Sequence, residues 1–155
     1  MADIVDTATR SRMMAGIRGK DTKPEKALRS ALHAIGLRYR LHARDVPGRP
    51  DLLFPKFGAV VFVHGCFWHR HQDCRYATIP ASRPEFWQAK FAANVARDQK
   101  VREALAEAGW RVATVWECAL RKPDQVAEAT ARVASWLKTD NALLEVPESS
   151  TPKRF

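Results

Sequence analysis

Apolar residues recur at helical spacing in three parts of the chain, and each part begins with a signal for a helix start. Thr22–Glu25 and Ser82–Glu85 both have the capping-box pattern, in which a hydroxyl residue is followed three positions later by glutamate. Pro123 opens the last part, as proline commonly does in the first turn of a helix. Glycine follows the first two parts and can end them. The pattern predicts helices over residues 22–35, 82–108 and 123–137.

Four shorter segments are apolar throughout or alternate between apolar and polar residues, as β-strands do. They are residues 37–41, 51–54, 59–63 and 111–117. Only Pro55–Gly58 separates the second from the third, which predicts a hairpin, and the continuous apolar character of the third predicts a central strand. The order of helix, three strands, helix, strand and helix predicts an α/β layer architecture with a mixed sheet.

No repeat or linker divides the chain, and 155 residues are enough for one domain with its own core. Residues 1–20 combine arginine and lysine with methionine and isoleucine, which predicts a basic N-terminal arm or short helix. The folded domain is expected over residues 21–138. Residues 139–155 are expected to form a flexible C-terminal tail.

Lys and Arg outnumber Asp and Glu by 26 to 17, which gives a net charge of +9 and a pI near 9.9. This surplus favours a polyanionic partner bound through phosphate contacts, although a basic protein that is merely soluble has the same composition. No basic amphipathic helix indicates a membrane surface, and the longest apolar run, Ala59–Val63, is too short to span a bilayer. The N-terminus lacks the apolar segment of a signal peptide, so a cytoplasmic protein is expected.

The segment Val63–Cys74 holds three of the five histidines and two of the three cysteines. An odd number of cysteines argues against a disulfide framework. Cys66, His71 and Cys74 offer thiolate and imidazole donors that suit one side of a tetrahedral zinc site. Cys118 could supply the fourth ligand. The alternative is that Cys118 is a buried core thiol and the loop cysteines are free, but their clustering with histidine favours zinc.

Asp51 lies where a turn-rich stretch, Asp45–Pro50, enters a predicted strand. Phosphodiester hydrolysis needs a carboxylate that holds Mg2+, because the ion positions the phosphate and activates a water molecule. The two strands of the predicted hairpin can place Asp51 beside His64 at one edge of the sheet. Glu25 is a candidate for orienting metal-bound water. The alternatives are that Asp51 is a cap or turn residue and that Glu25 only completes the capping box.

Aromatic residues gather in the loop and at the start of the long helix. Phe67 and Trp68 lie in the loop, where burial is hard to arrange, and Phe86 and Trp87 open the helix. Exposed aromatic side chains beside basic residues can stack on bases or insert between them. The alternative is that they pack over the loop, which suits Phe86 better than it suits the loop pair.

Several segments of the chain occur together, and in the same order, in one known family. They are Ala8–Arg12, Pro47–Asp51 (PGRPD), His64–His69 (HGCFWH), Arg83–Trp87, Asn94–Val95, Arg97–Asp98, Gly109–Val112 and Val115–Arg121 (VWECALR). On these segments the chain resembles the very short patch repair (Vsr) endonucleases over about residues 1–122. The resemblance implies a restriction-endonuclease-like, three-layer fold of the PD-(D/E)xK type. It also implies a nick 5′ to the thymine of a T:G mismatch, which arises when 5-methylcytosine deaminates.

The resemblance implies roles for individual residues as well. Asp51 would bind the catalytic Mg2+ with the main-chain carbonyl of Val63, a position where many relatives have threonine and where valine keeps the carbonyl. The other implied roles are catalysis by Glu25, His64 and His69, structural zinc binding by Cys66, His71, Cys74 and Cys118, intercalation by Phe67, Trp68 and Trp87, and contact with the mismatched pair by Met14, Lys90 and Asn94. A monomer that acts with mismatch-repair proteins of the MutL kind is also implied.

The expected reaction is in-line attack on one phosphodiester by a Mg2+-bound water. His69 would assist proton transfer, because an imidazole can act close to neutral pH. Two alternatives stay open. One is a non-catalytic, zinc-stabilised DNA-binding module, and the other is a restriction-type endonuclease that cuts fully paired DNA.

Overall fold

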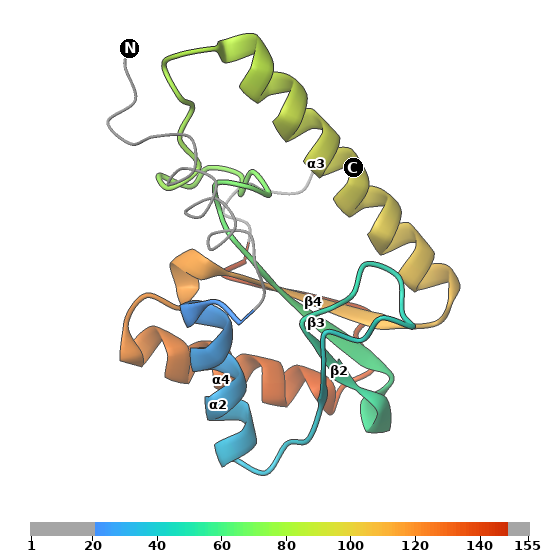
Figure 1. Ribbon diagram of the computed structural model, residues 1–155. Helices are drawn as coiled ribbons and strands as arrows, with labels where there is room; N and C mark the ends of the chain where they lie inside the picture. Colours follow the sequence, from blue (N-terminus) through green and yellow to red (C-terminus); the bar gives the residue numbers. More distant parts are fainter. Residues whose placement is uncertain (1–20, 149–155) are drawn as a thin grey trace.

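The computed structural model describes residues 21–148, in which five strands form one mixed sheet with helices on both faces (Figure 1). In their order across the sheet, the strands are β1 (Arg40–Leu41), β2 (Leu52–Phe54), β3 (Ala59–His64), β4 (Arg111–Trp116) and β5 (Leu143–Val146). The pairs β1–β2 and β2–β3 are antiparallel, whereas β3–β4 and β4–β5 are parallel. The predicted α/β architecture with a mixed sheet is confirmed.

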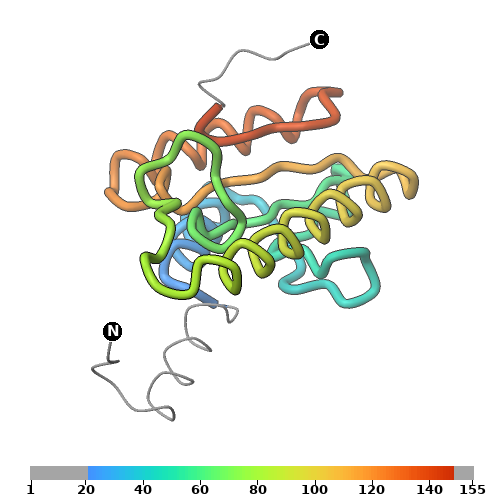
Figure 2. The backbone as a smooth tube through the Cα atoms, turned by 90° about the horizontal axis from the view of Figure 1, so that it is seen from above, coloured from blue at the N-terminus to red at the C-terminus, as the bar shows by residue number. Residues whose placement is uncertain are grey.

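Helices α2 (Lys23–Ala34) and α4 (Pro123–Leu137) cover one face of the sheet, and α3 (Pro84–Glu107) crosses the other (Figures 1 and 2). The larger core lies under α2 and α4, where Leu28 and Val133 are fully buried against the central strands. On the opposite face, Leu105 near the end of α3 packs against Val60 and Phe62. The C-terminal half of α3 is therefore anchored to the sheet, while its N-terminal half reaches beyond the sheet towards the loop that follows β3.

The start of α2 follows the predicted capping pattern with one change. The Thr22 hydroxyl accepts a hydrogen bond from the main-chain N–H of Glu25 (3.4 Å). The Glu25 carboxylate, however, accepts from the N–H of Asp21 (3.1 Å) and not from that of Thr22. The helix ends at Ala34 with Ile35 as its C-cap, and Gly36 follows with a φ of +96°, which is readily adopted only by glycine.

The start of α3 differs from the prediction. Pro84 is the first helical residue, so the cap is Arg83, which has φ +55° and makes no capping hydrogen bond through its side chain. The predicted capping box at Ser82 is wrong because a proline in the first helical position places Ser82 outside the first turn. Gly109, with φ +87°, follows the end of this helix as predicted.

Two predictions about strands are also wrong. The strand expected over residues 37–41 pairs only at Arg40 and Leu41, because Leu37 donates its N–H back to Leu32 at the end of α2. The tail expected from residue 139 onward contains β5, which pairs in parallel with β4 and buries Val146. The basic arm predicted over residues 1–20 and residues 149–155 lie outside the described part of the chain. Within residues 21–148, no helix combines the length and the apolar character needed to cross a membrane.

Candidate active site and metal centre

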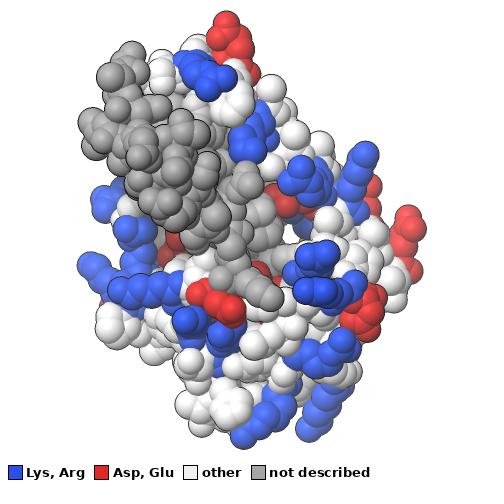
Figure 3. Space-filling model, in the orientation of Figure 1, with Lys and Arg blue, Asp and Glu red and all other residues white. Residues whose placement is uncertain are grey.

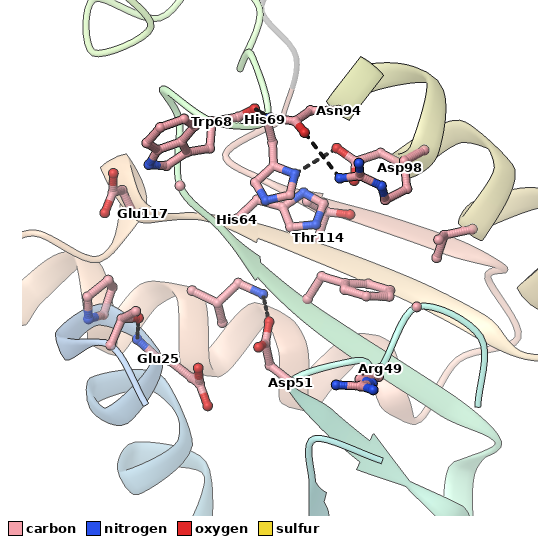
Figure 4. A pocket seen from close by; sticks show the side chains of 18 of the residues that line it. Glu25, Arg49, Asp51, His64, Trp68, His69, Asn94, Asp98, Thr114 and Glu117 are labelled. Atoms are coloured by element: carbon pink, nitrogen blue, oxygen red, sulfur yellow. Dashed lines mark hydrogen bonds and ion pairs between the residues drawn. The ribbon is translucent and has the colours of Figure 1, made fainter. Parts of the chain in front are cut away.

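A cavity of about 650 Å³ lies beside the start of β2 and the end of β3, between the first turn of α2 and the middle of α3 (Figure 4). Many of the residues predicted to be functional contribute to its wall. These are Glu25, Asp51, Val63, His64, Trp68, His69, Lys90 and Asn94. The fold therefore brings residues from four separate segments of the sequence to one place. Met14 lies outside the described residues.

Asp51 stands directly before β2, and its carboxylate reaches towards β3. The Asp51 Oδ2 atom accepts a hydrogen bond from the main-chain N–H of Val63 (2.7 Å). Enclosure by the protein raises the pKa of Asp51 to about 7; the Val63 hydrogen bond opposes this rise, and the negative charge of Glu25 adds to it. A divalent cation is the kind of ligand that would balance such a carboxylate, since Mg2+ prefers oxygen donors.

Asp51 belongs to none of the three groups of metal-ligating side chains within residues 21–148. A cation at Asp51 would therefore have at most one other ligand of these side-chain types and would take the rest from main-chain oxygen, water or substrate. Mg2+ commonly binds in this way, through one or two carboxylates with several waters retained. The donor chemistry around Asp51 thus fits Mg2+.

Glu25 is only 2% exposed, and hydrogen-bond donors surround its carboxylate. Oε1 accepts from the Asp21 N–H, while Oε2 lies 2.9 Å from a guanidinium nitrogen of Arg29 and 2.7 Å from Nε2 of His42. The Glu25 carboxylate is also close enough to Asp51 to raise the pKa of Asp51. Glu25 is therefore a buried residue of the cavity as well as part of the helix cap.

His64 and His69 form a stacked pair of imidazoles with ring centroids 3.8 Å apart and an angle of 5° between the planes. Figure 4 shows this pair on the opposite side of the β3 ribbon from Asp51, with all three residues around the cavity. His64 is 8% exposed, and burial lowers its pKa to about 3, to which the neighbouring His69 contributes. His64 is therefore neutral at physiological pH.

Asp98 on α3 is a member of this site for which the sequence predicted no role. Its Oδ2 lies 2.7 Å from Nδ1 of His69. Burial opposes ionisation of Asp98, but the interaction with His69 outweighs burial and lowers the pKa of Asp98. Two signals in the sequence could have placed Asp98 here: Arg97–Asp98 is one of the segments shared with the family, and Asn94 and Asp98 are four residues apart on a helix and so share one face. The site therefore contains a carboxylate–imidazole pair.

The four predicted zinc ligands, Cys66, His71, Cys74 and Cys118, converge in the structure. One ligand atom of each lies within 4.8 Å of the ligand atoms of the others, and Cys118 Sγ lies 3.5 Å from His71 Nδ1. All three cysteines are free of disulfides. In a tetrahedral Cys3His site with Zn–S near 2.3 Å and Zn–N near 2.0 Å, neighbouring ligand atoms are about 3.5–3.8 Å apart. This Cys3His group could therefore hold a zinc ion.

The surroundings of the Cys3His group favour a structural ion. Cys66 is fully buried and His71 is 9% exposed, and burial raises the pKa of Cys66 and lowers that of His71. The His71 ring also stacks on Trp116 of β4, with centroids 4.2 Å apart. Cys118 follows β4 in a short 3-10 helix, Glu117–Ala119, while the other three ligands lie in the loop after β3. An ion here would fasten that loop to the end of β4.

The loop aromatics pack against the start of α3 in one cluster. The ring centroid of Phe67 lies 4.9 Å from Trp68, 5.7 Å from Trp87 and 5.2 Å from Phe91. Trp68 is only 8% exposed, so the expectation that burial is hard to arrange in this loop is wrong for Trp68. Phe86, by contrast, is 44% exposed, and the interpretation that it packs over the loop is not favoured.

Hydrogen bonds explain how an irregular loop buries a tryptophan. The guanidinium of Arg70 donates to the carbonyl oxygens of Phe67, Ala77 and Thr78 and so joins the two ends of the loop. Arg70 also lies over the ring of Phe91, 3.9 Å from its centroid. The loop is therefore closed on itself and on α3.

Two residues predicted to contact DNA lie on α3 beside the loop. The Asn94 side-chain amide donates to the carbonyl oxygen of Trp68 (3.2 Å), and the Lys90 ammonium lies 5.9 Å from the Trp68 ring centroid. On the face seen in Figure 3, Lys and Arg side chains are spread along α3 and around α2, with fewer acidic side chains between them. Four basic residues, Arg49, Lys90, Arg97 and Arg102, also line the cavity, as a polyanionic partner requires.

Comparison with known proteins gives one consistent result. Residues 2–76 match the sequence profile of the family described as DNA mismatch endonuclease Vsr. The chain is 43% identical over 148 residues to DNA mismatch endonuclease Vsr of Escherichia coli (strain K12), and these residues make up 94% of each chain. It is 52% identical over 120 residues to the type II nicking enzyme V.XorIIP of Xanthomonas oryzae pv. oryzae, and these residues make up 77% of this chain and 88% of the relative. It is also 39% identical to the type II nicking enzyme V.NmeAIP of Neisseria meningitidis, over 89% of this chain and 98% of the relative.

Proposed function

The chain belongs to the Vsr family of DNA mismatch endonucleases, and we propose that it nicks one strand 5′ to the thymine of a T:G mismatch. The mismatch would arise by deamination of 5-methylcytosine, and the nick would begin very short patch repair. The observation that carries the proposal is the cavity in which the Asp51 carboxylate, with its raised pKa, faces the same space as the His64–His69 pair. That several relatives are named nicking enzymes supports cleavage of a single strand.

Asp51 and the main-chain carbonyl of Val63 would hold the catalytic Mg2+. A bound Mg2+ would neutralise phosphate charge and lower the pKa of a coordinated water. The main-chain N–H of Val63 in β3 holds the Asp51 carboxylate. The position of this carboxylate therefore depends on the register between β2 and β3, and not on contacts with other side chains that could move. The Glu25 carboxylate, held from three directions, would orient the attacking water.

His69 would move the proton in this reaction. Asp98 engages its Nδ1 atom, which leaves Nε2 as the nitrogen that exchanges a proton with the phosphodiester or its leaving oxygen. His64, neutral and stacked on His69, would fix the plane of the His69 ring. The roles of Asp98 and His64 are thus to orient and polarise one imidazole, as the carboxylate does in other acid–base pairs.

The Cys3His group would bind a structural zinc ion and fasten the loop that carries His69. The fold would be of the restriction-endonuclease-like PD-(D/E)xK type. Three layers around a mixed sheet support this assignment, as does the position of Pro50–Asp51 at the start of β2 in the central hairpin.

DNA recognition would use Phe67, Trp68 and Trp87 as intercalating aromatics, with Lys90, Asn94 and Met14 near the mismatched pair. Trp68 is buried in the protein without DNA, so insertion into a duplex would require the loop cluster to open. A monomer would suffice for a nick in one strand, and a protein of the MutL kind is the proposed partner.

One experiment tests the function. A T:G-mismatched duplex and its fully paired counterpart are incubated with the protein, with and without Mg2+, and the products are separated on a denaturing gel. We expect a single nick 5′ to the mismatched thymine, only in the presence of Mg2+. Cleavage of the paired duplex would favour a restriction-type enzyme. Binding without any nick would favour a non-catalytic DNA-binding module.

A further inference from the structure

His42 lies directly after β1 and contacts two of the acidic residues that line the cavity, Asp51 and Glu25. Leu41 pairs with Leu52 in the β1–β2 ladder, so the next residue, His42, lies opposite Asp51. The main-chain N–H of His42 donates to the carbonyl oxygen of Asp51 (3.1 Å). His42 has φ +48°, a left-handed conformation that is uncommon outside glycine and is often found at functional sites. The backbone of His42 therefore turns away from the strand at the point where it meets Asp51.

The side chain of His42 turns to the second acidic residue. Its Nε2 atom lies 2.7 Å from Oε2 of Glu25, and 17% of the side chain is exposed. Such a short contact with a carboxylate is a charge-assisted hydrogen bond when the imidazole donates. Because Glu25 is almost completely buried, the direction of its carboxylate depends on the donors around it.

The donors leave one part of the Glu25 carboxylate available. A carboxylate has about four acceptor positions. Arg29 and His42 occupy those of Oε2, whereas Oε1 accepts the Asp21 N–H. The carboxylate therefore keeps an acceptor position for one more donor: the Asp51 carboxyl while it is protonated, or a water molecule once a cation keeps Asp51 ionised.

The same residues are a poor site for an additional metal ion. Asp21, Glu25 and His42 have ligand atoms close together, but the Arg29 guanidinium lies 2.6 Å from Asp21 and 2.9 Å from Glu25. Arg29 already supplies the positive charge that a cation would bring. The cluster is better explained as a support for Glu25.

We propose that His42 is a positioning residue for nicking: its imidazole holds Glu25 in the orientation that directs the attacking water, and its N–H holds Asp51. This inference rests on the proposed function. It assigns a role to a residue that touches neither substrate nor metal and acts only through the two carboxylates. The main-chain contact with Asp51 survives substitution by any residue other than proline. Side-chain variants therefore report on the contact with Glu25 and on the longer approach to Asp21 (3.9 Å).

The test compares single-turnover nicking of a T:G duplex in Mg2+ by the wild-type protein and by variants of His42. Removal of a side chain that orients a residue next to a metal commonly lowers activity by about 10–100-fold. We expect such a loss of rate for His42→Ala, with unchanged affinity for the duplex in the absence of Mg2+. His42→Gln keeps an N–H donor at similar reach and should recover most of the rate. Both variants place a non-glycine residue at the same positive φ, so backbone strain does not distinguish them.

Two further comparisons sharpen the result. If His42 acts through Glu25, the double variant His42→Ala/Glu25→Gln should nick almost as fast as Glu25→Gln alone, so the losses of rate from the two substitutions should not add. His33→Ala removes an exposed histidine of α2 and should leave the rate unchanged. Should His42→Ala unfold, His42→Asn replaces it, because asparagine tolerates a positive φ but its shorter side chain falls short of Glu25.

The outcomes separate this inference from the proposed function. If the wild-type protein fails to nick any T:G duplex, the proposed function is wrong and the role of His42 in nicking falls with it. If the wild-type protein nicks and His42→Ala and His42→Asn nick equally fast, only the role of His42 is overturned. It is also overturned if His42→Gln is as slow as His42→Ala, or if the losses from His42 and Glu25 add in full.

Discussion

Replacing Asp51 by asparagine should abolish nicking and, above neutral pH, make the protein more stable. In the protein without a divalent cation, the pKa of Asp51 is about 7 and its ordinary value is 3.8. Between these values the folded state binds more protons than the unfolded state, so the Asp51 contribution to stability falls as the pH rises from about 4 to 7. Above pH 7 the carboxylate is ionised in both states and the whole loss persists.

The size of this loss follows from the same two values. A tenfold change in an acid dissociation constant corresponds to about 1.4 kcal/mol, so the upper value at pH 8 is about 4 kcal/mol. Relaxation of the cavity and entry of water reduce it, and we expect roughly 2 kcal/mol. Asparagine keeps an oxygen that can accept the Val63 N–H and removes the charge near Glu25. For a domain of this size the melting temperature should rise by roughly 4–8 °C at pH 8.

The assay is thermal unfolding of the wild-type protein and Asp51→Asn from pH 4 to pH 9 in buffer without Mg2+, followed by nicking in Mg2+. We expect equal stability near pH 4, a growing advantage of the variant towards pH 8, and no nicking. Asp45→Asn is the control, since Asp45 is exposed and its pKa is lowered by Arg40. A difference between wild type and Asp51→Asn that does not change with pH, or a less stable variant at pH 8, would refute the reasoning.

Three other substitutions test separate parts of the site. Asp98→Ala should slow nicking by about 10–100-fold without weakening DNA binding, because His69 loses the group that orients it; an unchanged rate in a single-turnover assay would contradict this role. Cys118→Ser should lower the zinc content, measured by atomic emission after dialysis, from about one ion per chain, and it should lower the melting temperature; full zinc content would exclude Cys118 as a ligand. Trp68→Ala should reduce the preference for T:G over paired duplex in competition binding, and equal selectivity would argue against insertion of Trp68.

The elements of the fold that depend on local patterns could be predicted from the sequence. The apolar stripe and the glycine at position 36 identified α2, and the apolar run Ala59–Val63 identified the central strand. Strand β5 could not be recognised, because its four residues, Leu143–Val146, become a strand only by pairing with the edge of β4, which the sequence does not reveal. The predicted capping box at Ser82 was wrong because Ser82 and Glu85 have the required spacing, but the helix begins at Pro84 with Arg83 as its cap, one residue after Ser82.

The residues of the site also fall into those that a local sequence pattern could predict and those that it could not. The Cys3His group could be predicted because soft donors crowd into one short loop, and Cys118 was identified as the candidate for its fourth member. Asp98 and His42 were missed because their partners are 29 and 17 residues away in the sequence and no local pattern links them. The burial of Trp68 was missed because it depends on α3 and on Arg70, which hold the loop closed.

With the proposed roles of Trp68 in recognition and His69 in proton transfer, recognition and catalysis would share one segment of this protein. Trp68 and His69 are consecutive, and α3 holds both, since Asn94 donates to the Trp68 carbonyl and Asp98 engages the His69 ring. The Cys3His group fixes the same loop from its other side, with Cys66 two residues before Trp68 and His71 two residues after His69. A movement that transfers Trp68 from its buried position to a DNA duplex therefore acts directly on the imidazole beside it. If Trp68 inserts at a mismatch as proposed, the loop would link that insertion to the alignment of His69, and a matched duplex that leaves Trp68 in place would not produce this coupling.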